Sequence, residues 1–283
     1  MTATVRTALA HAIAQLEPSD SAELDAQVLL AKVLGKQRSW LYAWPEQSLT
    51  TAQMLEFNTL IDRRSQAEPL AYITGKRAFW KLELQVNPVV LIPRPETELL
   101  VELALEVGRG LSGPVADLGT GSGAIALALA LERPDWQVHA SELSTAAMQT
   151  AADNLHASGL RNVQLFSGSW LSPLPAGGQY QLIVSNPPYI NADDPHLQQK
   201  GLAFEPRTAL VAGNAGLADL AQIATEAPSR LQPGGWLLLE HGWQQAEAVR
   251  TLLLQSGYQQ IQTKQDHGGR DRVTLGKWSR KDE

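Results

Sequence analysis

Residues 114–132 read PVADLGTGSGAIALALALE, an apolar run, a loop with glycines at alternate positions and a second apolar run. The first run is typical of a strand and the second of a helix, so Gly119, Gly121 and Gly123 lie in the turn between them. Glycine suits such a turn because the turn is tight and a ligand has to approach the backbone closely. The stretch therefore predicts an α/β domain with a ligand site at the end of its first strand.

Strands and helices continue to alternate after this stretch. Strand-like runs stand at 136–141, 162–168, 180–185 and 236–240, with helical stretches at 145–159 and 217–231. Such alternation predicts a mostly parallel sheet covered by helices on both faces. The segments YQQIQTKQD (258–266) and RVTLGKW (272–278) predict an antiparallel strand pair at the C-terminal end.

The residues before the α/β region have a different pattern of apolar side chains. Residues 1–75 have apolar side chains at helical spacing and predict a small helical bundle. Residues 76–95 contain the strand-like AFWKLELQV (78–86) and then a proline-rich run, which excludes a helix before Pro95. We expect a hairpin or extended linker there, and the α/β domain over 96–283.

Composition limits the classes of protein that are possible. The 283-residue chain is 44% hydrophobic, enough for a sizeable core, and its formal net charge of −6 disfavours nucleic acid as the main partner. It has no Cys, which excludes disulfides and thiolate zinc sites and fits a reducing compartment. The His residues show no metal-ligand spacing, so we expect no metal site. Because the N-terminus lacks a signal-peptide pattern and no apolar run is long enough to span a bilayer, we expect a cytoplasmic protein with no membrane partner.

An acidic residue completes the ligand site. Glu142 ends the second predicted strand, where a carboxylate can accept both hydroxyls of a ribose. Dinucleotide-binding folds prefer G-x-G-x-x-G, whereas this loop reads G-x-G-x-G after Asp117. The segment DLGTGSG (117–123) resembles the first motif of class I S-adenosylmethionine-dependent methyltransferases. That resemblance implies the Rossmann-like class I fold and S-adenosylmethionine as the cofactor, a ligand without phosphate.

The stretch SNPPYI (185–190) follows the fourth predicted strand and resembles the [Asn/Asp]-Pro-Pro-aromatic corner of class I enzymes that methylate planar nitrogens. Such a nitrogen is a weak nucleophile that carries two N–H donors. The side-chain oxygen of Asn186 and the carbonyl of Pro187 can accept both, while Pro187 and Pro188 stiffen the backbone and Tyr189 packs on the planar group. The motif occurs in enzymes that act on adenine N6, guanine N2 and glutamine amides, so the motif alone does not choose between these substrates.

Three longer blocks, at 68–105, 185–217 and 237–245, are similar to the HemK/PrmC family of release factor glutamine methyltransferases. The similarity runs through almost the whole chain and includes the helical domain, for which it implies a role in recognising the substrate protein. It implies methylation at N5 of the glutamine in the Gly-Gly-Gln loop of class I peptide chain release factors.

Carried over position by position, the resemblance implies the following site residues. The cofactor contacts are Gly119, Thr120, Gly121, Ser122, Gly123, Glu142, Trp170 beside the adenine, Asn186, and Arg94 and Thr97, which close over the cofactor. The glutamine pocket is Asn186, Pro187, Pro188 and Tyr189. Two positions depart from the family pattern: Glu142 stands where Asp is more frequent, and Ser169 stands where an Asp often precedes the Trp.

Other functions compete with this hypothesis. The nearest is methylation of a glutamine in a ribosomal protein, and the next is a nucleic-acid N-methyltransferase that uses the same corner. A third alternative is a cofactor-binding protein without catalysis, in which the Asn-Pro-Pro-Tyr corner would have no chemical role. Glu205, in FEPRTAL (204–210), is interpreted as a structural residue that pairs locally with Arg207.

Overall fold

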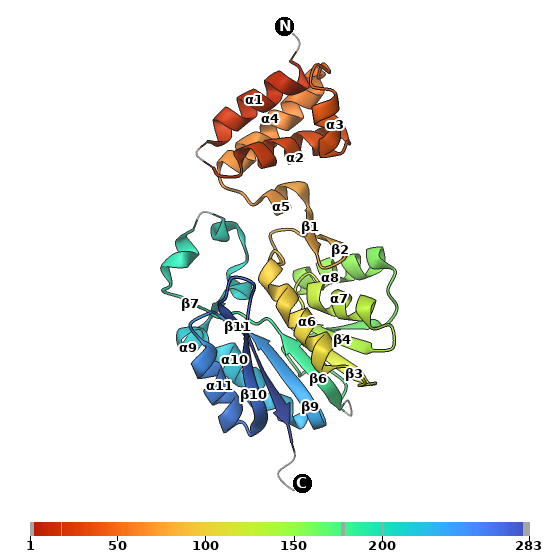
Figure 1. The fold of residues 1–283 in the computed structure, drawn as a ribbon, viewed down its shortest axis with the longest axis vertical. Coiled ribbons are helices and arrows are strands. Elements are labelled where there is room, and N and C mark those ends of the chain that lie inside the picture. The colour runs from red at the N-terminus through yellow and green to blue at the C-terminus, as the bar shows by residue number, and fades with distance from the viewer. Residues whose placement is uncertain (1–2, 18, 177–178, 200, 280–283) are drawn as a thin grey trace. The chain divides into compact units, whose positions relative to one another are not determined.

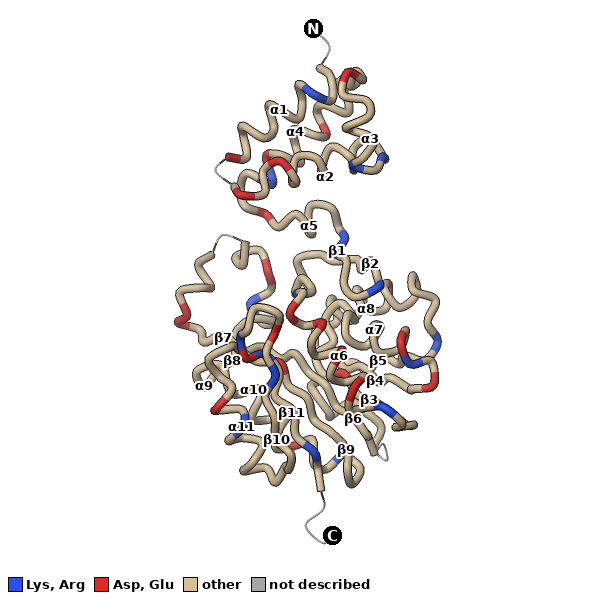
Figure 2. Tube along the Cα trace, viewed as in Figure 1, with Lys and Arg blue, Asp and Glu red and all other residues tan. Residues whose placement is uncertain are grey.

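The computed structural model describes residues 3–17, 19–176, 179–199 and 201–279. The chain divides into two compact units, Met1–Gly75 with Gln198–Phe204, and Lys76–Leu197 with Glu205–Glu283. The outermost residues of the expected domains, 1–2 and 280–283, lie outside the described residues. Both units carry acidic and basic residues along their length (Figure 2).

The first unit is a small helical bundle (Figure 1). Its helices are α1 (Val5–Leu16), α2 (Ala22–Leu34), α3 (Arg38–Ala43), α4 (Thr51–Ser65) and α5 (Leu70–Thr74). Helices α1 and α4 each begin with a capping box, in which a Thr hydroxyl accepts a backbone N–H of the first turn. Their apolar faces enclose one core, which includes Leu29, Phe57 and Ile61. The predicted helical bundle is confirmed, whereas the short helices α3 and α5 were not predicted.

The second unit contains a seven-stranded sheet in the order β10-β11-β9-β6-β3-β4-β5. Its strands are β3 (Pro114–Leu118), β4 (Gln137–Glu142), β5 (Val163–Ser167), β6 (Tyr180–Ser185), β9 (Leu231–Glu240), β10 (Tyr258–Gln265) and β11 (Asp271–Trp278). Strands β3, β4, β5, β6 and β9 are parallel, and β11 pairs antiparallel with both β9 and β10. The predicted mostly parallel sheet with an antiparallel C-terminal pair is confirmed.

Helices cover both faces of this sheet (Figure 1). They are α6 (Glu98–Val107), α7 (Ala124–Glu132), α8 (Thr145–Ser158), α10 (Ala218–Glu226) and α11 (Ala246–Gln255). Successive residues of β6 enter different cores, because strand side chains alternate between faces: Val184 packs in the cluster that includes α6 and α7, and Ile183 in the cluster that includes α10 and α11. The strand that carries the Asn-Pro-Pro-Tyr corner is therefore buried on both sides.

The expected hairpin also forms in this unit. Strands β1 (Lys76–Phe79) and β2 (Leu82–Gln85) pair antiparallel, and a single 3-10 turn (Pro95–Thr97) leads from the proline-rich run into α6. The side chain of Asn154 in α8 bonds both backbone groups of Gln85 and the carbonyl of Ser122. This residue connects the hairpin to the glycine loop.

Several shorter elements lie between or beside these strands and helices in the chain. They are β7 (Ile190–Asn191), β8 (Val211–Ala212), α9 (Gly213–Gly216) and the 3-10 turns Pro195–Gln198, Leu202–Phe204, Arg207–Ala209 and Ala227–Ser229; of these, the turn Leu202–Phe204 and the end of Pro195–Gln198 belong to the first unit. Among the described residues, no helix has the length and apolar character that crossing a membrane requires.

Candidate active site

The glycine loop joins β3 to α7 at the carboxyl end of the sheet, as predicted. The backbone N–H groups of Gly119 and Thr120 both donate to the carbonyl of Ser141, at 2.9 and 3.0 Å, so the loop stays against the end of β4. Gly119, Gly121 and Gly123 have φ of +72°, +57° and +85°. Side chains are strained in this left-handed region, which explains the alternating glycines physically.

Asp117 holds this loop from within the sheet. Its Oδ2 accepts the Thr120 hydroxyl at 2.6 Å and the Ala126 N–H at 3.1 Å. Burial raises the pKa of its carboxyl to about 7, and Oδ1 is buried without a hydrogen-bond partner among the described residues. The sequence pointed to Asp117 only as the residue before the glycines, because its contacts depend on the fold.

Glu142 faces the same loop from the end of β4. Its Oε2 accepts the Gly121 N–H at 2.9 Å and its Oε1 accepts the Ser144 N–H at 2.8 Å. Each carboxylate oxygen keeps a second lone pair for a ligand hydroxyl. The space above Gly121 is open, since no atom lies within 4 Å of where a Cβ would be. The oriented acid and the open loop fit the ribose of an adenosine.

Two apolar side chains flank this site. The Trp170 ring lies against the loop, because a Cβ on Gly119 would be only 2.9 Å from its Cζ3. Leu143 follows Glu142 and its side chain is 71% exposed, an unusual position for a large apolar group. Sequence reasoning singled out Trp170 but missed Leu143, whose only signal was its place directly after the acid. Both are suited to contact a purine ring.

The Asn-Pro-Pro-Tyr corner begins where β6 ends. The Ser185 hydroxyl donates to the Leu118 carbonyl at 2.7 Å, which ties the ends of β6 and β3 together. The Nδ2 of Asn186 donates to the Thr97 hydroxyl at 3.2 Å. Within the described residues, no hydrogen bond from a donor to Asn186 Oδ1 is present. The amide oxygen is therefore available to an incoming N–H group.

Gln245 braces the other end of the corner. Its Nε2 donates to the carbonyls of Tyr189 (3.0 Å) and Ala215 (3.4 Å), and its Oε1 accepts the Gly242 N–H at 2.9 Å. Gly216 approaches the same Tyr189 carbonyl so closely that a Cβ there would be 2.1 Å from the oxygen. Sequence reasoning missed both residues, although Gln245 ends one of the blocks that carried the family resemblance.

Arg94 and Thr97 reach the site from the segment before α6. Thr97 is buried and contacts Asn186, as described above. The Arg94 guanidinium forms an ion pair with Glu205, whose other oxygen accepts the Ile92 N–H at 3.1 Å. The expected pair between Glu205 and Arg207 is wrong: the Glu205 side chain turns into the protein, whereas Arg207 lies exposed in a 3-10 turn.

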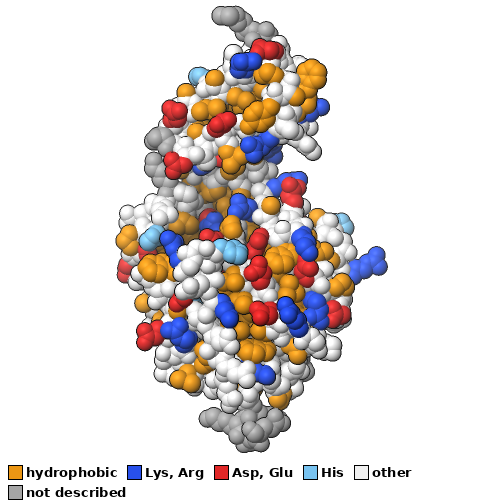
Figure 3. All heavy atoms as spheres, in the orientation of Figure 1, with side chains coloured by type: hydrophobic (Ala, Val, Ile, Leu, Met, Phe, Trp, Pro, Cys, Tyr) orange, Lys and Arg blue, Asp and Glu red, His pale blue; other side chains and the backbone are white. Residues whose placement is uncertain are grey.

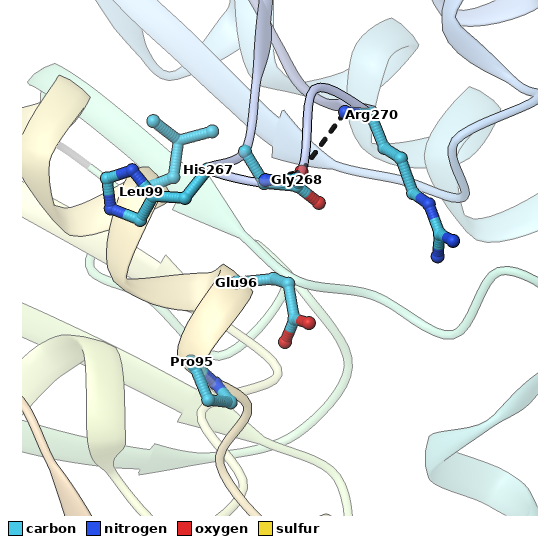
Figure 4. A pocket seen from close by; sticks show the side chains of 7 residues that line it. Pro95, Glu96, Leu99, His267, Gly268 and Arg270 are labelled. Carbon is cyan, nitrogen blue, oxygen red and sulfur yellow. Dashed lines mark hydrogen bonds between the residues drawn. The ribbon is translucent and has the colours of Figure 1, made fainter.

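A buried carboxyl group lies beside these residues. Glu240, the last residue of β9, is 1% exposed, and burial raises its pKa to about 7, although the neighbouring Thr97 and Asn186 side chains favour its ionised form. Nearby, Pro95, Glu96 and Leu99 face His267, Gly268 and Arg270 of the β10–β11 turn across a surface pocket (Figure 4). Sequence reasoning assigned no role to Glu240.

Comparisons with known proteins agree with this geometry. Residues 7–75 match the family model of the PrmC N-terminal domain, and residues 95–202 match that of the methyltransferase small domain. The chain is 51% identical over 280 residues to a release factor glutamine methyltransferase of Vibrio cholerae, covering 98% of each chain. It is 47% identical to the protein of that name from Escherichia coli, covering 95% of this chain and 97% of that one.

The chain belongs to the release factor glutamine methyltransferase family. It is accordingly an S-adenosylmethionine-dependent methyltransferase, and the family resemblance read from the sequence is confirmed.

Solved structures show how widely the fold is shared. A methyltransferase from Pyrococcus furiosus superposes with a TM-score of 0.55 at 18% identity, covering 77% of this chain and 99% of that one. A T. thermophilus 16S rRNA N2 G1207 methyltransferase, solved with AdoMet and guanosine, gives 0.52 at 22% identity, covering 72% of this chain and 50% of that one. At this identity the likeness establishes the class I fold and nothing about the substrate.

Replacing Glu142 with Ala is expected to weaken S-adenosylmethionine binding by about 10- to 100-fold, because hydrogen bonds to a charged group contribute about 1.5–3 kcal/mol. Isothermal titration calorimetry of the purified variant measures the change. The control is Glu106→Ala, which removes an exposed carboxylate from α6 and should leave the affinity unchanged. Wild-type affinity in the Glu142 variant would show that the ribose binds elsewhere.

Proposed function

We propose that this enzyme transfers a methyl group from S-adenosylmethionine to N5 of the glutamine in the Gly-Gly-Gln loop of class I peptide chain release factors. The observation that carries the proposal is the Asn186 amide, whose nitrogen is bonded to Thr97 and whose oxygen has no donor from the described residues. Membership of a family named for this activity supports the choice of substrate.

The Asn-Pro-Pro-Tyr corner compensates for the weak nucleophilicity of a carboxamide nitrogen by orienting it. A glutamine amide delocalises its nitrogen lone pair into the carbonyl and is a poor nucleophile. Asn186 Oδ1 and the Pro187 carbonyl accept its two N–H groups and hold the nitrogen in one orientation. The two prolines fix the direction of that carbonyl, and Tyr189 packs on the planar amide. Positioning by fixed dipoles, without a strong base, is the source of catalysis.

The cofactor side of the site is assigned in the same proposal. S-adenosylmethionine would supply a methyl group on a cationic sulfur; transfer to the amide nitrogen would leave a neutral thioether, and an N–H proton of the glutamine would then leave to water. Glu142 binds the ribose hydroxyls, Trp170 and Leu143 contact the adenine, and the loop Gly119, Thr120, Gly121, Ser122 and Gly123 accommodates the methionine part. Arg94 and Thr97 close this side, with Arg94 held by Glu205.

The helical unit has a separate role in this proposal, the recognition of the substrate protein. It exposes large apolar side chains, with Tyr42 at 64%, Trp44 at 57% and Leu55 at 71% of their surfaces. Exposed aromatic and aliphatic groups favour contact with a folded protein. Because release factors act on cytoplasmic ribosomes, the proposal also includes a cytoplasmic location.

The competing substrates are disfavoured by different observations. Nucleic acid is disfavoured because basic and acidic side chains are mixed on the face in view in Figure 3, where a phosphate-binding surface would concentrate basic ones. A ribosomal-protein glutamine is compatible with the same corner, since the amide chemistry is identical. The two relatives named above are both release factor glutamine methyltransferases, which favours the release factor.

The decisive experiment incubates the enzyme with methyl-labelled S-adenosylmethionine and a purified class I release factor, and then maps the label by mass spectrometry. We expect one methyl group on the Gly-Gly-Gln glutamine. A release factor with Gly-Gly-Ala in that loop is the matched control and should remain unlabelled. Parallel incubations with ribosomal proteins and with ribosomal RNA test the alternatives. Label on either of these, and none on the release factor, would refute the proposed substrate.

A further inference from the structure

The Asn186 side chain has two possible amide orientations, and only one suits catalysis. Rotation by about 180° exchanges Oδ1 and Nδ2 with little change in shape. With Nδ2 turned inward, Oδ1 accepts an N–H of the substrate. With the amide reversed, an N–H group would face the N–H groups of the substrate, and neither could bond. Something in the protein therefore has to select the orientation.

The inward side of Asn186 contains acceptors that make this selection. Its Nδ2 donates to Thr97 Oγ1 at 3.2 Å. Glu240 follows Leu239, which pairs with Ser185 in the sheet, so its buried carboxyl lies next to Asn186. Both Thr97 and Asn186 favour the ionised form of this carboxyl. These groups come from three separate elements: the 3-10 turn before α6, the end of β6 and the end of β9. All three lie in the methyltransferase unit.

The charge state of Glu240 determines whether Thr97 can donate toward it or must accept from it. An ionised carboxylate only accepts, so the Thr97 hydroxyl hydrogen points to Glu240 and the Thr97 lone pairs face Asn186. That arrangement requires a donor on Asn186, which is Nδ2. A protonated Glu240 can instead donate to Thr97, and the Thr97 hydroxyl can then donate to a reversed Asn186 through Oδ1.

We propose that Glu240 is a positioning residue, whose buried carboxylate fixes the Asn186 amide, directly and through Thr97, with Oδ1 toward the substrate. Glu240 does not touch the reacting atoms. Its Oε2 is buried without a hydrogen-bond partner among the described residues, so it can accept a hydrogen bond from a neighbouring donor. This inference rests on the proposed function, in which Asn186 Oδ1 accepts an N–H of the glutamine.

Several charged groups surround the carboxyl. Arg272 on β11 favours the ionised form of Glu240, while Glu96 in the turn before α6 opposes it. The Tyr189 phenol interacts electrostatically with Glu240, and Arg272 and Arg94 place positive charge near that phenol. Burial is the largest influence and raises the pKa of Glu240 to about 7. The carboxylate is then lost as the pH falls through about 7, and the fraction of correctly oriented Asn186 falls with it.

The kinetic test compares wild type with Glu240→Gln, which keeps the shape of the side chain but places an NH₂ donor beside Thr97 in place of a carboxylate oxygen. We expect kcat to fall at least tenfold, with S-adenosylmethionine affinity within threefold of wild type. We also expect wild-type kcat to decrease below a midpoint at or below about pH 7, and the variant to lose this step. Glu106→Gln, an exposed carboxylate on α6, is the control. A variant within twofold of wild type, or one that keeps the same pH step, would overturn the proposal.

A second measurement needs no protein substrate, so it separates this inference from the proposed function. The side-chain NH₂ signals of Asn186, assigned by their disappearance in Asn186→Asp, are followed by NMR from pH 5.5 to 8.5 in wild-type protein. We expect both signals to shift with the titration of Glu240. Signals that do not change across this range would refute the role of Glu240, even if the release factor is methylated. Failure of the release factor to be methylated, with titrating signals, would instead refute the substrate alone.

Discussion

Asn186→Ala is expected to lower kcat for glutamine methylation by about 10³-fold or more, while the affinity for S-adenosylmethionine stays within about threefold of wild type. One of the two acceptors for the substrate N–H groups is removed, so the nitrogen is no longer held in line with the methyl group. Removal of one fixed dipole at a reacting centre costs about 10²- to 10³-fold, and the lost orientation adds to this. The cofactor loop and Glu142 come from β3 and β4 and are not changed.

Single-turnover assays with labelled cofactor measure this loss, and calorimetry measures cofactor binding on the same sample. Asn191→Ala is the matched control, because Asn191 is an exposed residue of β7 a few positions further along the chain. Its kcat should equal that of wild type. An Asn186 variant that retains activity within a few-fold would show that its side chain does not position the substrate.

The parts of this site that sequence reasoning predicted are those with local signals. The strand, glycine turn and helix around Gly121 form one continuous stretch, and Glu142 ends the next strand. Parallel strands bring their carboxyl ends to one edge of the sheet, so these residues and Asn186 could be placed together before the fold was known. The family resemblance supplied the substrate class, which the residues alone left open.

The parts that sequence reasoning missed depend on pairs of residues far apart in the chain. Asn186 bonds Thr97, which is 89 residues away, and Arg94 pairs with Glu205, 111 residues away. Glu240 has the sequence context of an ordinary strand end, and only burial makes its carboxyl unusual. Helices α3 and α5 were missed for another reason: helices of 6 and 5 residues show too little periodicity to detect.

The same long-range packing makes Gly216 a sensitive position, although it lies outside the glycine loop. It has a φ of +85°, and a Cβ there would be 2.1 Å from the Tyr189 carbonyl oxygen and 2.7 Å from Gln245 Nε2. Neither neighbour can yield freely. The carbonyl belongs to the backbone of the corner, and the Gln245 amide is already bonded to that carbonyl and to Gly242.

Gly216→Ala is therefore expected to displace the Tyr189 carbonyl and to lower kcat about 100-fold, because even a 1 Å error in positioning costs about that much. The free energy of unfolding should fall by about 2–4 kcal/mol, from the left-handed backbone and the forced repacking together. Gly159→Ala separates the two causes: Gly159 has a similar φ of +69° but no atom within 4 Å of its Cβ position. That control should lose about 1 kcal/mol and keep full activity. Denaturant unfolding and kcat are measured on both variants. An equal loss of kcat in the two variants would mean that the contact of Gly216 with the Tyr189 carbonyl does not hold the corner in place.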